Sequence, residues 1–473
     1  MQARPGSALV LPDRGPGARP RPWPAARLRR HRKRRSHHRR PGTRHRGRRA
    51  LHDRRPSPTR RDRGSGHARG RDIRRTRPAH RHHNDMTARI LHVARVVTGL
   101  STVHAPGTVV VDDKHIAWVG TPDQLPDTWT TNKPHQIHLP QATLLPGLID
   151  AHVHLAFDHS ADPHRAAEKW GTAVQQLLHG GITTARDLGA PHHTDISAVA
   201  GTSGPRILSA GVPLTIPGGH CDEFGGSVTT AADIDRIVSH NAERGAAWIK
   251  VMVTGGFTSR GPSSPYSPQF TDTQLADIVA AARDHDLPVA AHAHGTAGIR
   301  QAVEAGVDSL EHCTWMTENG FHLDHGIVNA IAEQRILVCP TINHLARHAS
   351  GRLPWPVRRA QLVAMLSAGV RIVPGSDAGI PHTPHHLYGR SLPAYTDLGF
   401  SPAEVVDLVT RRAAEALRVG HLTGTLTAGR AADLIAAPGD PTRELHALTT
   451  PILVMSSGHL HYLDINAEED TPR

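Results

Sequence analysis

Two histidines with one residue between them follow an apolar run that is typical of a buried strand. The run covers residues 144–149, and His152 and His154 come soon after it. Alternate side chains of a strand point to the same side, so both imidazoles can aim at one point beyond its carboxyl end. Two converging imidazoles indicate a metal site. The signal is weak by itself, because the chain holds 38 His and repeats this spacing at three other places.

The elements that must position these histidines recur along residues 144–419. Short apolar segments alternate there with amphipathic, helix-like stretches, a pattern that predicts β/α units. The apolar segments begin at Leu144, Ile182, Arg206, Trp248, Pro288, Ser309, Ile336 and Arg371, and the helix-like stretches include Ala231–Gly245, Thr271–Asp286 and Val357–Ala368.

Eight such units predict an α/β fold, a (β/α)8 TIM barrel. A doubly wound open sheet is the alternative and fits less well, because no Gly-rich phosphate loop opens the first helix. Thr271 followed by Gln274 is a good capping pair for one helix. In a barrel the carboxyl ends of the strands surround the active site. The residues at those ends are His152, His154, Lys250, His292, His294, His312 and Asp377, which together predict a metal centre.

Lys250 stands in an apolar strand between Ile249 and Val251. If its neighbours point outward, its own side chain points into the barrel. A buried ammonium is costly, so it needs a partner or must lose its charge. Reaction of the neutral amine with CO2 gives a carbamate, an anion that can bridge two cations. The alternative is a lysine paired with a buried carboxylate.

Two other candidates also have ordinary structural interpretations. His312 could be a core histidine with its hydrogen bonds satisfied, and Asp377 could be a helix N-cap, a position that favours Asp. Their places at strand ends favour metal ligation for both.

Several ordered motifs resemble the amidohydrolase superfamily, in the branch with a binuclear metal site bridged by a carboxylated lysine. Within it, the chain is most similar to the Xaa-Pro dipeptidase or imidazolonepropionase-like group. The resemblance covers residues 88–463 and none of residues 1–85. Imidazolonepropionases proper lack the lysine, so its presence argues against their chemistry. The motifs are LLPGLIDAHVH, GITTARDLG, IPGGH, WIKVMVTGG, VAAHAHG, LEHC, PGSDAG and GTLTAGRAADLI.

The resemblance implies two divalent metal ions. Zinc is the first choice, and Mn, Fe or Co would suit the same donors. A hydroxide and the CO2-derived carbamate of Lys250 would bridge the ions. The implied ligands are His152, His154 and Asp377 for the buried ion, and His292 and His312 for the more exposed ion.

The resemblance also assigns roles around the metals. Asp377 would act as general base and then general acid. His294 would lie behind the ligands or near substrate, although it could replace His292 as ligand. His220 would contact substrate or the transition-state oxygen, with Tyr266 and Arg186 near the pocket. Each of these last three could equally be a loop residue without a special role.

The implied function is a metal-dependent amidohydrolase. A metal-bridging hydroxide would cleave an amide bond of a small dipeptide-like (Xaa-Pro) or N-acyl amino acid substrate. The alternative is a related hydrolase of an ester, cyclic amide, lactone or toxin. Specificity is expected in the loops at 213–230, 255–270 and 379–396.

The amino-terminal segment differs from the rest of the chain in its charge composition. Residues 1–85 carry 28 Lys and Arg against five Asp and no Glu, whereas the remainder carries 27 basic and 37 acidic residues. Such a segment cannot bury enough apolar surface to fold, so we expect disorder. It could bind nucleic acid through charge, which makes a nucleic-acid binder the third functional hypothesis. It could be a targeting segment, or the result of a start codon chosen too early, with Met86 as the true start. We favour the last.

The predicted domains are a disordered extension at 1–85, a β-sandwich from 86–143 and 420–463, a hydrolase barrel at 144–419 and a tail at 464–473. The sequence contains no run of about 20 apolar residues, so it predicts no membrane-spanning helix. The three cysteines form no disulfide framework. We therefore expect a cytoplasmic enzyme with a small-molecule substrate, and the family's habit suggests a homo-oligomer.

Overall fold

The fold is taken from a computed structural model of the chain. It describes residues 88–99, 102–131, 134–157, 162–199, 204–257, 259 and 263–464. The predicted disordered extension and nearly all of the predicted tail lie outside these residues.

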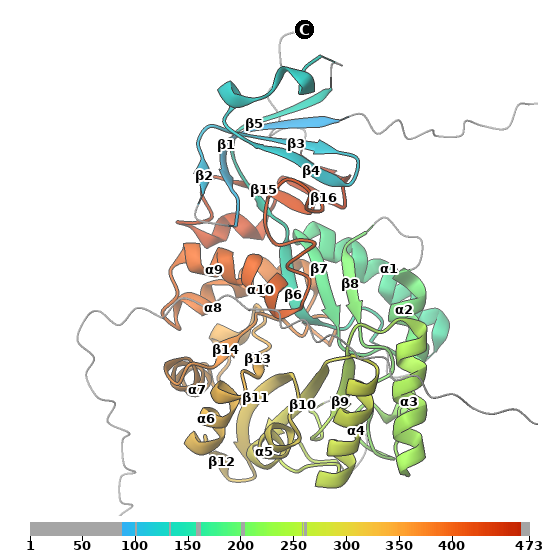
Figure 1. Cartoon of the computed structure of the whole chain (residues 1–473). Helices are drawn as coiled ribbons and strands as arrows, with labels where there is room; N and C mark the ends of the chain where they lie inside the picture. Colours follow the sequence, from blue (N-terminus) through green and yellow to red (C-terminus); the bar gives the residue numbers. More distant parts are fainter. Residues whose placement is uncertain are drawn as a thin grey trace, which may run out of the picture. The chain divides into compact units, whose positions relative to one another are not determined.

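One mixed sheet of eight strands contains residues from both predicted sandwich segments (Figure 1). Its centre is β5 (His135–Pro146), which is parallel to β1 (Arg89–Val97) and antiparallel to β15 (Leu434–Pro438). The strand order is β17-β16-β15-β5-β1-β3-β4, with β2 also paired to β1. The other strands are β2 (Val103–His104), β3 (Gly107–Asp112), β4 (His115–Gly120), β16 (Leu453–Ser456) and β17 (His459–Leu463).

Two further sheets hold the strands predicted for the barrel. Seven of the eight predicted segments start at, or one residue before, an observed strand. The first differs, because Leu144 and Leu145 pair with β15 and still belong to β5, so the next strand starts only at Leu148. One sheet has the order β6-β7-β8 and the other β14-β13-β11-β10-β9, with β12 paired to β11. Their bounds are β6 (Leu148–Val153), β7 (Ile182–Asp187), β8 (Arg206–Ser209), β9 (Ile249–Met252), β10 (Val289–Gly295), β11 (Ser309–Thr317), β12 (Gly320–Phe321), β13 (Leu337–Cys339) and β14 (Arg371–Ile372).

The strands β6 to β14, β12 excepted, are parallel within their sheets. Two isolated parallel bridges link the sheets through segments that follow their edge strands. Leu214, after β8, pairs with Val251 of β9, and Ala378, after β14, pairs with Val153 of β6. The fold is therefore α/β with one mixed and two largely parallel sheets, and the closed barrel stays a prediction.

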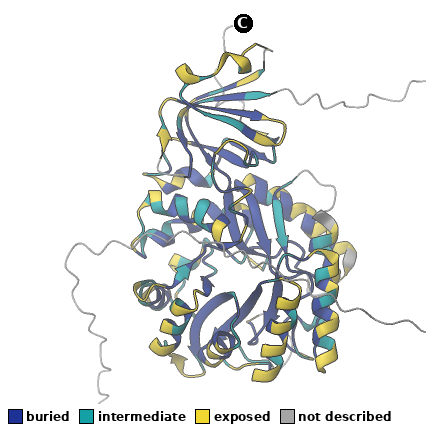
Figure 2. Ribbon diagram, viewed as in Figure 1, coloured by how far each residue is buried: buried dark blue, intermediate teal, exposed yellow. Residues whose placement is uncertain are grey.

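Helices lie between successive strands and bury one face each, as the dark and yellow sides of α3 and α4 show (Figure 2). The predicted capping pair is confirmed: the Thr271 hydroxyl accepts from the backbone N–H of Gln274 at 3.2 Å, and the Gln274 side chain accepts from the N–H of Thr271 at 3.0 Å. Among described residues, no helix is long and apolar enough to span a membrane. The helices are α1 (Pro163–His179), α2 (Thr194–Val199), α3 (Ala231–Arg244), α4 (Asp272–Asp284), α5 (Thr296–Ala305), α6 (His325–Glu333), α7 (Trp355–Ser367), α8 (Pro393–Thr396), α9 (Pro402–Leu408) and α10 (Arg411–Ala416).

Candidate metal centre

His152, His154 and Asp377 converge on one point at the carboxyl end of β6. The Nε2 atoms of the two histidines are 3.3 Å apart, and each lies 3.3 Å from Oδ1 of Asp377. Both histidines are buried. No helix begins within the four residues after Asp377, so the interpretation of this residue as a helix cap is wrong.

The other ring nitrogen of each of these two histidines, Nδ1, has a hydrogen-bond partner in the protein. Nδ1 of His152 lies 2.7 Å from Oε2 of Glu311, and Nδ1 of His154 lies 3.3 Å from the carbonyl oxygen of Gly189. A carboxylate or carbonyl on one imidazole nitrogen fixes the ring and leaves the other nitrogen for a metal. The donor set therefore fits a divalent cation.

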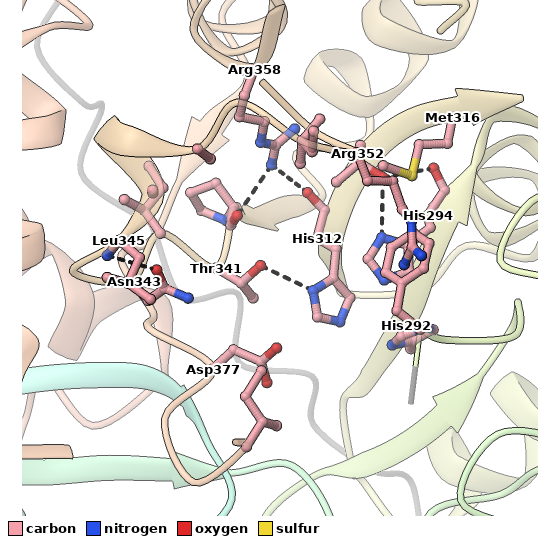
Figure 3. Close-up of a pocket in the computed structure, with 18 of the residues that line it drawn as sticks. His292, His294, His312, Met316, Thr341, Asn343, Leu345, Arg352, Arg358 and Asp377 are labelled. Atoms are coloured by element: carbon pink, nitrogen blue, oxygen red, sulfur yellow. Dashed lines mark hydrogen bonds between the residues drawn. The ribbon is translucent and has the colours of Figure 1, made fainter. Parts of the chain in front are cut away.

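A second group of imidazoles, from β10 and β11, lies beside the first. Single ligand atoms of His292, His294 and His312 lie within 4.8 Å of one another. The ring centroid of His312 is 5.2 Å from that of His152, so the two groups are neighbours. Nδ1 of His312 lies 3.0 Å from Oγ1 of Thr341, which leaves its Nε2 for a ligand (Figure 3).

The structure brings both His292 and His294 into this group and does not choose between them. Nε2 of His292 lies 3.1 Å from the carbonyl oxygen of Gly255. Nδ1 of His294 lies 3.1 Å from Oγ1 of Thr314. Each ring thus has one nitrogen engaged and one nitrogen left, so both alternatives stay open.

The lowered pKa values of His152, His292, His294 and His312 favour the neutral imidazole that metal ligation requires. Burial, with the nearby charge of Lys250, lowers the pKa of His152 to about 4. Burial and His220 lower the pKa of His294 to about 3. Burial also lowers the pKa values of His292 and His312 well below the usual range.

Lys250 lies on β9 with only 1% of its side chain exposed, and it lines the same cavity as Asp377 and His312. In the part of the chain that the structure describes, its ammonium has no hydrogen bond and no carboxylate within ion-pairing distance. Burial lowers the pKa of Lys250. A buried amine without a partner is what a carbamate would explain, and that modification stays a prediction.

The PGSDAG motif packs against β6 through a buried carboxylate and two glycines. Asp150 accepts hydrogen bonds from the hydroxyl of Ser376 at 2.5 Å and from its backbone N–H at 3.0 Å. Burial raises the pKa of Asp150 to about 7. A Cβ at Gly375 would lie 2.8 Å from Cβ of His152, and Gly379 has φ +103°. Only glycine lets this segment approach so closely.

A cavity of about 420 Å³ opens over both groups. The predicted specificity loops contribute a few residues to its wall, such as Phe257 and Ile380. Most of the outer wall comes instead from residues 340–355, which the sequence analysis did not single out. Those wall residues include Ile342, Asn343, Leu345, Ala346, Gly351, Arg352, Leu353 and Trp355.

The three weaker sequence candidates lie in different surroundings. His220 lines the cavity, with its ring centroid 4.7 Å from that of His292. Tyr266 does not line the cavity, and its backbone packs against Gly295. Arg186 is fully buried outside the cavity wall. That location suits a support for the ligands better than a contact with substrate.

Arg186 supports His152 through Glu311, a residue to which the sequence analysis gave no role. The guanidinium donates to Oε1 of Glu311 at 2.8 Å and to the carbonyl of Ala151 at 2.6 Å, and it stacks on Trp248 at 4.4 Å. Burial alone would raise the pKa of Glu311, but Arg186 and His152 outweigh it and hold the pKa below its usual range. A carboxylate in a buried strand, directly before His312, was the available signal.

Comparison with known proteins adds independent evidence. Residues 143–460 match the amidohydrolase family. The ochratoxinase of Aspergillus niger is 27% identical over 416 residues, covering 76% of this chain and 83% of the relative. The imidazolonepropionase of Nocardia farcinica is 27% identical over 388 residues, covering 72% and 87%.

The fold is also similar to those of solved structures. A Xaa-Pro dipeptidase with bound methionine in the active site superposes with a TM-score of 0.70 at 25% identity, covering 80% of this chain and all of that one. A putative prolidase from Bifidobacterium longum gives a TM-score of 0.65 at 27% identity, covering 79% and 94%.

Proposed function

We propose, given that the chain belongs to the amidohydrolase family, that it uses two divalent metal ions to cleave the amide bond of a small dipeptide-like or N-acyl amino acid substrate. The single observation that carries this proposal is the pair of ligand groups that share one cavity with Lys250, which has no partner among the described residues. A closed eight-stranded barrel would hold both groups, and the two bridges between the parallel sheets support it.

The proposed ligands are those that the resemblance implied, with His292 or His294 beside His312 and carboxylated Lys250 between the groups. When bound, the ions would polarise the scissile carbonyl and lower the pKa of the attacking water. Zinc is the first choice for imidazole and carboxylate donors. Lys250 acts electrostatically on His152, His292 and Asp377, which is consistent with a location between the two groups.

The chain's own groups would move the proton and orient the substrate. Asp377 lines the cavity, where its carboxylate would take a proton from the attacking water and pass it to the leaving amine. His220 lines the cavity beside His292 and would donate a hydrogen bond to the carbonyl oxygen. Ser259 holds the other nitrogen of His220, since its Oγ lies 3.1 Å from Nδ1.

The wall of the cavity supports a substrate with one apolar and one anionic part. Phe257, Met316 and Leu345 give an apolar surface. The guanidinium of Arg352 lies 4.2 Å from the ring centroid of Phe257, and no carboxylate of the described residues pairs with it. In an N-acyl amino acid the carboxylate lies roughly 4 Å from the scissile carbon, one peptide unit away. Arg352 at the rim would bind that carboxylate.

The first test is metal content per chain together with hydrolysis of a panel of Xaa-Pro dipeptides and N-acyl amino acids. We expect about two ions and activity that disappears with a chelator and returns with zinc. Two ions without hydrolysis would contradict the substrate class alone. One ion or none would contradict the bridging role of Lys250.

Lys250→Met tests the bridge, and Lys114→Met in an exposed turn is the matched control. The variant should lose bound metal and activity, yet its metal-free form should be at least as stable as the wild type, because a buried unpaired amine is removed. A destabilised metal-free variant would instead indicate that Lys250 is paired with a carboxylate.

A further inference from the structure

The backbone at the end of β11 has an unusual conformation. His312, Cys313 and Trp315 have φ values of 66°, 50° and 57°. None of them is glycine, and L-residues avoid this left-handed region for steric reasons. The conformation directs His312 toward the cavity while Cys313 and Trp315 are fully buried in the core. Something must hold a backbone that is unfavourable at three of four successive residues.

Two side chains of α7 hold the carbonyl groups of this segment. The guanidinium of Arg358 donates to the carbonyl oxygens of His312 and, at 2.7 Å, of Cys313. Gln361, one turn further along α7, donates to the carbonyl oxygen of Thr314 at 2.8 Å. Gln361 also accepts a hydrogen bond from Arg358 at 3.2 Å, which links the two side chains. Three successive carbonyls are therefore bound from one helix.

Arg358 also binds the turn that orients the imidazole of His312. Its guanidinium donates to the carbonyl oxygen of Pro340 at 3.2 Å (Figure 3). The next residue, Thr341, places its hydroxyl oxygen 3.0 Å from Nδ1 of His312. One side chain thus connects the backbone of the ligand with the residue that fixes the ring of the ligand.

The positive charge of Arg358 is costly in this buried place, so its presence calls for a role that an apolar side chain could not perform. Its side chain is 3% exposed, and within the described part of the chain no carboxylate pairs with it. It is the fourth residue of α7, close to the positive end of the helix dipole. Burial lowers its pKa to about 10, so the side chain is charged at neutral pH. An apolar side chain would fill this place at lower electrostatic cost.

We infer that Arg358 is a positioning residue for His312, and that it acts by clamping the carbonyls of His312, Cys313 and Pro340. Through this clamp, Nε2 of His312 is held toward the cavity in the absence of metal. The inference rests on the proposed function, because it takes His312 as a metal ligand. A guanidinium is suited to this task, since its planar fork presents several donors in a fixed geometry.

The test compares Arg358→Met and Arg358→Lys in the full chain. Arg359→Met is the matched control, because Arg359 is exposed on the same helix and, among the described residues, donates only to the carbonyl of Asp397. Hydrogen exchange of residues 309–317 is measured in metal-free protein, and zinc affinity is measured by calorimetry. We expect faster exchange in Arg358→Met and a zinc affinity lower by about 10- to 100-fold. Arg358→Lys should be intermediate and the control unchanged.

The kinetic readout separates positioning from general destabilisation. In Arg358→Met, kcat should fall while KM for substrate changes little. Wild-type exchange together with wild-type zinc affinity would overturn the inference and leave the proposed function intact. If the wild type binds none of zinc, manganese, iron or cobalt, the proposed function fails and hydrogen exchange alone decides whether the clamp exists. If Arg358→Met does not fold, Arg358→Lys and Gln361→Met decide, and unchanged exchange in both overturns the clamp.

Discussion

Replacing Glu311 with Gln tests whether one buried carboxylate supports both the fold and the metal centre. Oε1 of Glu311 accepts from Arg186 at 2.8 Å and from Ser309 at 2.5 Å, while Oε2 lies 2.7 Å from Nδ1 of His152. A glutamine has one oxygen and one NH2 group in the same space. It can therefore serve Arg186 or His152, but not both.

Each orientation of the glutamine has its own cost. Because glutamine is neutral, the fully buried guanidinium of Arg186 loses its anion in either orientation, and an NH2 group that faces it also removes the hydrogen-bond acceptor. Breaking a buried pair in this way costs about 3–5 kcal/mol. We expect about 3 kcal/mol, the lower end, because Arg186 keeps the Ala151 carbonyl and the Trp248 ring. If the NH2 group faces His152, Nδ1 must become the acceptor, and Nε2 then carries the proton that blocks a metal.

Urea unfolding of the metal-free protein and zinc calorimetry measure the two costs. Glu311→Gln should lose about 3 kcal/mol of unfolding free energy. If the amide oxygen stays on Arg186, the variant should also bind zinc about 10- to 100-fold more weakly. Glu415→Gln is the matched control, because its pair with Arg411 lies on the surface and should contribute under about 1 kcal/mol. A variant with wild-type stability and wild-type zinc affinity would refute the reasoning.

Three further predictions concern catalysis, specificity and pH. Asp377→Asn should lower kcat by about 100-fold or more, and full activity with metal still bound would show that Asp377 does not transfer the proton. Arg352→Met should raise KM about tenfold for N-acyl amino acids and leave KM unchanged for their amides; an equal change for both would exclude carboxylate binding. Burial, with the charges of Arg244 and His240 on α3, lowers the pKa of His193 to about 4. The unfolded imidazole takes up its proton near pH 6.5, so this contribution to stability is present above that pH and is lost as pH falls toward 4. His193→Gln should flatten the dependence of the urea midpoint in that window, and an unchanged slope would contradict the assignment.

The strand positions could be predicted because a short apolar run is a local signal. Seven strand starts agree within one residue with the apolar segments. The exception at Leu144 arose because β5 and β6 are separated only by Gly147, so one apolar run serves two sheets. The ligands could be predicted for a related reason, since the ends of parallel strands meet at one edge.

The supporting residues could not be predicted in this way, because their roles depend on partners far along the chain. Arg186 and Glu311 are 125 residues apart, and Arg358 lies 46 residues after His312. Periodicity identifies Glu311 as a buried carboxylate, but it does not show that Arg186, on β7 of the other parallel sheet, lies beside it. The wall at 340–355 was missed because its apolar residues show neither strand nor helix periodicity.

Three buried cationic side chains lie near the proposed metal centre, and they differ in the partners of their charges. Arg186 is paired with the carboxylate of Glu311, and Arg358 is surrounded by carbonyl oxygens. Lys250 has neither kind of partner among the described residues, although it is as deeply buried. An arginine cannot give up its proton inside a protein, whereas a buried lysine can. Of the three, the cation without a hydrogen bond or ion pair among the described residues is thus the one whose charge can be removed, and a neutral amine is the form that reacts with CO2. This contrast is the strongest structural argument for a carbamate at Lys250, and it would fail if Lys250→Met destabilised the metal-free protein.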